Sequence, residues 1–132
     1  MKPGIEWRAP RADAEAAQFA ADLHAALART PKAISPKYFY DETGSRLFEQ
    51  ICELPEYYPT RTELALLARH AGDLAARMGP GAQLIEYGAG ALVKVRLLLA
   101  RMAQPDSFVP VDISGPHLLA ACEALQREQP EL

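Results

Sequence analysis

Apolar residues near the start of the chain recur at helical intervals. Phe19, Leu23 and Leu27 follow one another every four residues within an alanine-rich segment from about Asp13 to Arg29. Such spacing places side chains on one face of an α-helix. The pattern therefore predicts an amphipathic helix, and Pro31 ends it because proline has no backbone N–H and disfavours helix in the residue before it.

Two further helices are predicted before residue 82. The first runs from Ser45 to Glu53 and is expected to bury Leu47, Phe48 and Ile51. The second follows Thr60, which stands three residues before Glu63, the spacing of a capping box. Its apolar positions continue with helical periodicity as far as the breaker at residues 79–81: Leu64, Leu67, Ala71, Leu74 and Met78.

The pattern changes at Gln83, where an apolar run enters the turn Gly88-Ala-Gly90. Glycines accept positive φ and let a backbone approach a ligand closely. A helical face follows the turn, and Ser107 to Asp112 reads as a second strand, with Pro110 suiting an edge or an end. The final helix is expected to be capped by Ser114 and to place these residues on one face: Leu118, Cys122 and Leu125.

Together these elements predict an α/β fold, with N-terminal helices followed by the first βαβ unit of a Rossmann-like sheet. Residues 1–82 form a helical segment with a tyrosine- and proline-rich region, and residues 83–132 form the start of the cofactor-binding domain. A doubly wound sheet needs several strands, and only two are predicted here. The sequence is therefore expected to be the truncated front part of a longer fold.

Composition narrows the class of function. Of 132 residues, 49% are hydrophobic and 23% are charged. Acidic residues number 17 and basic residues 14, without a long run of either sign. This balance favours a small-molecule substrate over nucleic acid or a membrane surface. Cys52 and Cys122 stand alone, without the spacing of a metal site or a disulfide framework. With no signal-peptide pattern at the N-terminus, a cytoplasmic location is predicted.

The glycine turn and Asp112 are the candidate cofactor site. Asp112 stands 24 residues after Gly88, close to the spacing at which a carboxylate accepts hydrogen bonds from a ribose diol. The third glycine of the dinucleotide fingerprint would fall at Val93, which favours a nucleoside cofactor such as S-adenosylmethionine. Glu86 is either a residue of the same crevice or a solvated charge. Lys94 is either a surface lysine or a partner for the methionyl carboxylate.

Three segments carry a resemblance to a known family: PKYFYDETGSRLFEQICELPEYYPTRTE, LIEYGAGALVKVRLLL and FVPVDIS. In this order and spacing they closely resemble the histidine-specific S-adenosylmethionine-dependent methyltransferases, the L-histidine Nα-methyltransferases of ergothioneine biosynthesis. The resemblance implies a class I methyltransferase sheet and trimethylation of the histidine α-amino group to hercynine. It also implies that Gly88, Lys94 and Asp112 bind the cofactor and that Tyr57 and Tyr40 line the substrate pocket. No residue is assigned a catalytic role.

Two other interpretations stay open. The chain could be a non-catalytic module, stabilised by self-association or by a partner at an exposed sheet edge. A nicotinamide-nucleotide protein would rest on the Gly-x-Gly turn and Asp112 alone. The glycine turn also departs from the family pattern, because Gly88-Ala-Gly-Ala-Leu-Val-Lys94 lacks the hydroxyl side chains of the usual G-S-G-T-S. Activity of the chain in isolation is accordingly not assumed.

Overall fold

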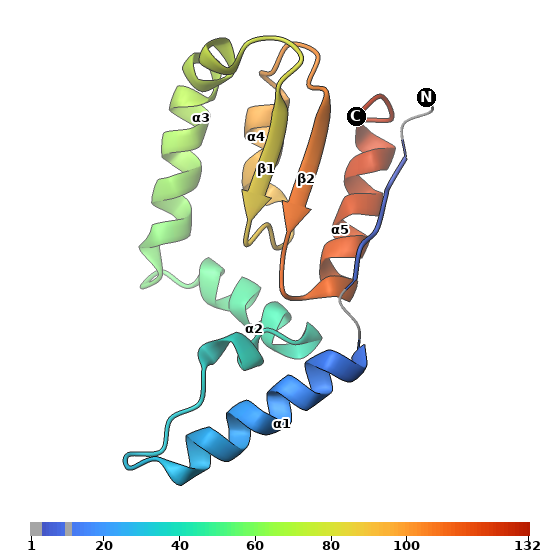
Figure 1. Ribbon diagram of the computed structural model, residues 1–132. Coiled ribbons are helices and arrows are strands. Elements are labelled where there is room, and N and C mark those ends of the chain that lie inside the picture. Colours follow the sequence, from blue (N-terminus) through green and yellow to red (C-terminus); the bar gives the residue numbers. More distant parts are fainter. Residues whose placement is uncertain (1–3, 10–11) are drawn as a thin grey trace.

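A computed structural model describes residues 4–9 and 12–132, and it combines helices with one small parallel sheet. In Figure 1, α3, α4, α5 and the sheet form one body, α1 lies apart from it, and α2 lies between them. The helices and strands in order are α1 (Ala12–Ala28), the 3₁₀ helix η1 (Pro36–Phe39), α2 (Glu42–Glu53), α3 (Tyr58–Met78), β1 (Gln83–Tyr87), α4 (Val93–Leu99), β2 (Ser107–Val111) and α5 (Gly115–Glu128).

The two strands pair in parallel and are joined through α4, which confirms the predicted βαβ unit. Leu84 is the register partner of Phe108, and both pack against the buried core between the sheet and its helices. That core draws residues from the turn, from three helices and from the loop after α4: Ala75, Ala89, Leu92, Val95, Leu99, Met102, Leu118 and Leu125. The mixed helix-and-sheet class is therefore confirmed, and the hydrophobic core lies on one side of the sheet.

The turn between β1 and α4 contains three left-handed residues. Gly88 has φ +72° and Gly90 has φ +54°, as a glycine turn requires. Leu92 also has φ +58°, although its side chain is fully buried. A left-handed leucine costs about 1–2 kcal/mol. Burying a leucine side chain stabilises by about 1.5–3 kcal/mol, which is enough to offset that cost.

The predicted start of α2 was wrong by three residues. Asp41 caps the helix, and its carboxylate accepts a hydrogen bond of 2.7 Å from the Gly44 N–H. The expectation of a buried face was also wrong, since Leu47, Phe48 and Ile51 are 53%, 37% and 41% exposed. Among the described residues, the Tyr40 and Tyr57 rings pack against Phe48 and cover this face of α2 only in part.

The predicted capping box at the start of α3 was wrong as well. The helix begins at Tyr58, and Pro59 occupies the first turn, where its missing N–H would have no intrahelical partner in any case. Thr60 and Glu63 therefore lie inside the helix. The Glu63 carboxylate instead lies 3.2 Å from the Lys94 ammonium.

Polar contacts attach α1 to the segment that follows it. The Tyr38 hydroxyl donates to the Asp22 carboxylate at 2.5 Å, and the Lys37 ammonium lies 3.0 Å from the same oxygen. The Phe19 ring packs edge-on against Tyr38, with ring centroids 4.8 Å apart. Hydrogen bonds from Tyr38, Lys37 and Gln18 lower the pKa of Asp22 to about 2.

The stabilising effect of Asp22 depends on pH in a defined direction. Because its pKa is lowered from 3.8 to about 2, its contribution is complete well above pH 4 and is lost as the pH falls through about 2. In an NMR titration we expect the Asp22 carboxyl to have its midpoint near 2, and Tyr38→Phe to raise that midpoint. Tyr58→Phe, at an exposed tyrosine of α3, should leave it unchanged. Equal midpoints in all three proteins would contradict this.

Candidate functional site

The candidate cofactor site lies at the carboxyl ends of β1 and β2. The N–H groups of Gly88 and Ala89 both donate to the carbonyl of Val111, at 2.8 and 3.2 Å. The turn after β1 is therefore attached to the last residue of β2. In open α/β sheets this edge is where ligands bind.

Asp112 holds the glycine turn by its side chain. One carboxylate oxygen accepts from the Gly90 N–H at 2.9 Å, and the other accepts from the Ser114 N–H at 2.8 Å. A carboxylate has about four acceptor positions, so two remain for another donor. The structure thus brings Gly88 and Asp112, two of the predicted cofactor residues, to one place. Ser114 stands at the N-cap position of α5, as predicted, but its buried hydroxyl makes no capping hydrogen bond in the described chain.

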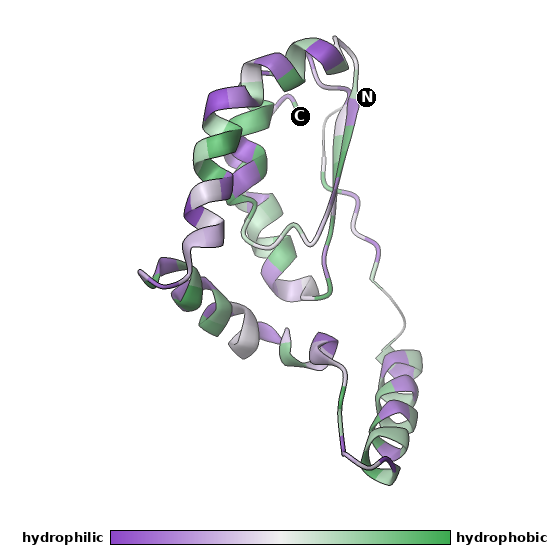
Figure 2. Cartoon of the chain, turned by 90° about the vertical axis from the view of Figure 1, so that its left-hand side faces the viewer, coloured by the Kyte–Doolittle hydropathy of each residue, from purple (hydrophilic) through white to green (hydrophobic). Residues whose placement is uncertain are grey.

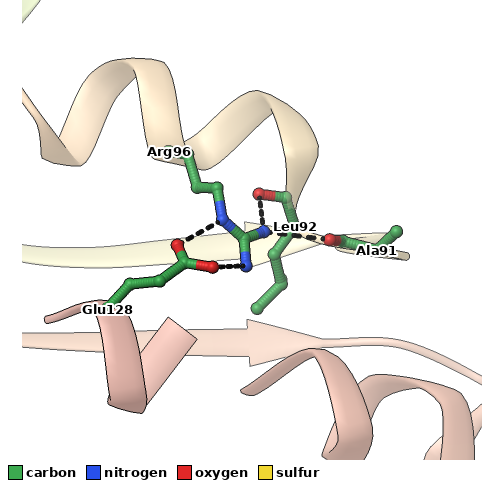
Figure 3. A network of polar contacts seen from close by, with 4 residues as sticks. All are labelled: Ala91, Leu92, Arg96 and Glu128. Atoms are coloured by element: carbon green, nitrogen blue, oxygen red, sulfur yellow. Dashed lines mark hydrogen bonds and ion pairs between the residues drawn. The ribbon is translucent and has the colours of Figure 1, made fainter. Parts of the chain in front are cut away.

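Arg96 supports the same turn from the other side. Its guanidinium donates to the carbonyls of Ala91 and Leu92 at 3.2 and 2.9 Å and pairs through two nitrogens with the Glu128 carboxylate, as Figure 3 shows. The Arg96 hydrogen bond lowers the pKa of Glu128. Bidentate pairing fixes both orientation and distance. Arg96 therefore ties the start of α4 to the end of α5.

Lys94, the third predicted cofactor residue, faces a cavity beside the turn. The cavity has a volume of about 180 Å³ and lies between α3, β1 and α4. Within it the Lys94 ammonium pairs with Glu63. Both side chains are partly exposed, at 36% and 53%, and such exposed pairs contribute only about 0–1 kcal/mol. Lys94 can therefore exchange this partner for another carboxylate at small cost.

Glu86 lines the same cavity and has an unusual environment. One of its carboxylate oxygens is buried and has no hydrogen-bond partner in the described chain. Burial raises the pKa of Glu86, Lys94 lowers it, and Glu63 and Asp112 raise it further. A buried acceptor without a partner is costly unless a donor reaches it. Of the two sequence interpretations, the structure therefore favours the crevice over a solvated charge.

The two predicted substrate tyrosines meet at one phenylalanine. Phe48 of α2 lies edge-on to Tyr40 and to Tyr57, with ring centroids 6.0 and 5.8 Å away. Edge-to-face pairs of this kind contribute about 0.5–1.5 kcal/mol beyond simple burial. Phe48 was expected in a core and was missed as a site residue. Its place in the tyrosine-rich segment was the only available sequence signal.

Arg61 is a second residue that sequence reasoning missed. Its guanidinium donates to the carbonyls of Leu54 and Pro55 at 2.7 and 2.6 Å and lies 3.4 Å from that of Tyr57. These three carbonyls belong to the connection between α2 and α3. A planar guanidinium holds several acceptors in a fixed arrangement. Arg61 therefore sets the backbone that carries Tyr57.

The cluster of Tyr40, Phe48 and Tyr57, called the tyrosine cluster, is not directly joined to the glycine turn in the described chain. No hydrogen bond or ring contact within residues 4–9 and 12–132 joins them. In the same residues, no three His, Cys, Asp or Glu side chains are grouped to hold a metal ion. None of the described helices has the length and hydropathy needed to cross a membrane.

Arg61→Ala should loosen the connection around Tyr57. The Tyr57 N–H donates to the carbonyl of Leu54 at 3.1 Å, and Arg61 holds that carbonyl from the other side. By hydrogen exchange we expect the Tyr57 amide to exchange about tenfold faster in the variant, because losing one such bond costs about 1–1.5 kcal/mol. Arg69→Ala, on the same helix, is the control. Unchanged exchange at Tyr57 would show that Arg61 does not position it.

Comparison with known proteins identifies a family that this chain matches. Residues 19–132 match the family model described as histidine-specific methyltransferase, SAM-dependent. The chain is 42% identical over 110 residues to a histidine N-alpha-methyltransferase of Mycobacterium tuberculosis, covering 81% of this chain and 34% of that protein. It is 40% identical over 122 residues to the protein of the same name from Mycolicibacterium smegmatis. That match covers 90% of this chain and 38% of the relative.

A third relative is the ergothioneine biosynthesis protein 1 of Neurospora crassa. It is 44% identical over 69 residues, which cover 52% of this chain and 8% of that protein. The chain thus spans little more than a third of the length of the two bacterial relatives.

Proposed function

The chain belongs to the histidine-specific, S-adenosylmethionine-dependent methyltransferase family, and on this premise we propose that it provides the methyl-donor loop and one substrate wall of a histidine Nα-methyltransferase. The activity would be N-methylation of histidine to hercynine in ergothioneine biosynthesis. The observation that carries the proposal is the Asp112 carboxylate, which holds the glycine turn where both strands end.

The residues present fit S-adenosylmethionine, which when bound supplies a methyl group on a sulfonium. A Cβ atom added at Gly88 or Gly90 would meet no atom within 4 Å beyond the neighbouring residues, so a ligand can approach this backbone. Asp112 keeps acceptor positions for ribose hydroxyls. Lys94 can turn from Glu63 to the methionyl carboxylate.

On the substrate side, positioning is the main requirement. A neutral amine attacks the methyl group in line, so the site must hold the amine close and aligned. Tyr40 and Tyr57, braced by Phe48, offer hydroxyl tips that orient the amine and aromatic faces that tolerate the cationic product. Arg61 keeps Tyr57 in place. Tyr57 acts here as a binding residue, without a role as a strong base.

A kinetic experiment tests the proposal. The chain is joined to the part of the Mycobacterium tuberculosis relative that it does not match, and hercynine is measured by mass spectrometry. We expect Asp112→Ala to raise KM for S-adenosylmethionine by about tenfold or more with little change in KM for histidine, because it removes hydrogen bonds to one ligand only. Tyr57→Ala should raise KM for histidine selectively.

Tyr58→Ala is the matched control. Tyr58 adjoins Tyr57 but is 67% exposed and takes no part in the described ring pairs, so both KM values should stay within about twofold. No hercynine from the unsubstituted fusion would contradict the proposal. Binding of neither S-adenosylmethionine nor histidine would favour the non-catalytic module instead.

A further inference from the structure

The connection between η1 and α2 brings two stretches of backbone very close together. Gly44, in the first turn of α2, faces the carbonyl of Phe39, the last residue of η1. A Cβ atom placed on Gly44 would stand 1.6 Å from the Phe39 carbonyl oxygen and 2.8 Å from the carbonyl carbon. Non-bonded carbon atoms lie about 3.5–4.0 Å apart at their optimum. Glycine is therefore the residue that fits at position 44 while Phe39 stays where it is.

Hydrogen bonds fix this close approach at the start of α2. The Asp41 carboxylate accepts from the Gly44 N–H at 2.7 Å, and the Asp41 carbonyl accepts from the Ser45 N–H at 2.8 Å. Ser45 is itself buried, at 9% exposed. The atoms that a side chain at Gly44 would meet in Phe39 belong to the backbone, which cannot rotate aside as the end of a flexible side chain can. Such a side chain would therefore displace Phe39 together with its neighbour, Tyr40.

Tyr40 is one of the two proposed substrate tyrosines, and its ring depends on this geometry. It lies edge-on to Phe48 of α2, with ring centroids 6.0 Å apart. Gly44 and Phe48 are four residues apart on α2, so they share one face of the helix. The approach of the Phe39 carbonyl to Gly44 therefore sets the point on α2 that the Tyr40 ring reaches.

The position of α2 gives this contact a functional meaning. In Figure 1, α2 lies beyond the carboxyl ends of β1 and β2, and the side view in Figure 2 places it below the same end of the body. We propose that Gly44, with its hydrogen bond to Asp41, is a positioning residue that holds Tyr40 in the pocket for the histidine substrate. This rests on the proposed function. A displacement of about 1 Å in a positioned group is enough to impair an aligned reaction.

The first test uses NMR on the chain alone. Nuclear Overhauser contacts should join the Phe48 ring to both Tyr40 and Tyr57, whose ring centroids are 6.0 and 5.8 Å away. Gly44→Ala should remove the contact with Tyr40 and keep the contact with Tyr57, because only the first depends on the close approach. Gly72→Ala is the matched control and should keep both contacts, since a Cβ atom on this exposed glycine of α3 would meet no atom within 4 Å.

The second test measures kinetics in the fusion that makes hercynine. Gly44→Ala should raise KM for histidine by about tenfold and leave KM for S-adenosylmethionine within about twofold, because it displaces a group that contacts one ligand only. Tyr40→Ala should have the same selective effect. The double variant should be no worse than Tyr40→Ala alone, since two changes that act through one side chain are not additive. A merely structural role of Gly44 would give additive losses and overturn the proposal.

Asp41→Ala keeps the test decisive if Gly44→Ala does not fold. It removes the hydrogen bond to the Gly44 N–H without adding an atom there, so it should weaken the Tyr40–Phe48 contact and raise KM for histidine by about threefold. An unchanged contact and KM in this variant would contradict the proposal, as would absence of the contact from the unsubstituted chain. No hercynine from the unsubstituted fusion would instead reject the proposed function, while the NMR contacts would still decide whether Gly44 positions Tyr40.

Discussion

The structure depends on the two hydrogen bonds that the Asp112 carboxylate accepts from the Gly90 and Ser114 N–H groups. They connect the turn after β1 to the start of α5, and the Val111 carbonyl adds two more bonds to that turn. With the turn fixed in this way, Leu92 can adopt a left-handed conformation and fill the core. The same carboxylate orders the backbone and lies at the edge of the sheet where we propose that the cofactor binds.

The predicted site residues form two groups with different surroundings. The glycine turn is embedded in the sheet and its helices, whereas Tyr40, Phe48 and Tyr57 are only partly buried. Arg61 organises the second group locally, through carbonyls within seven residues of it. Apolar side chains of α2 and of the sheet are exposed in the described chain.

Local signals predicted the order of elements well. The glycine turn, the apolar run before it and the position of Asp112 predicted the βαβ unit because each depends on neighbouring residues only. Predictions that required knowing what packs nearby were less successful. Phe48 has the periodicity of a core residue, yet it packs edge-on against Tyr40 and Tyr57 and stays 37% exposed. Thr60 and Glu63 have capping spacing, but Pro59 moved the helix start ahead of them. Spacing in the sequence indicates neither the carbonyl contacts of Arg61 nor the buried, unpartnered oxygen of Glu86, since both depend on distances in the folded chain.

The central claim is that the turn held by Asp112 is the cofactor site. Its most direct test is a titration of the isotope-labelled chain with S-adenosylhomocysteine, followed by amide NMR. We expect saturable shifts at Gly88, Gly90 and Ser114, with the amides of α1 unchanged. Absence of shifts at these glycines under millimolar ligand, or shifts confined to other parts of the chain, would contradict it.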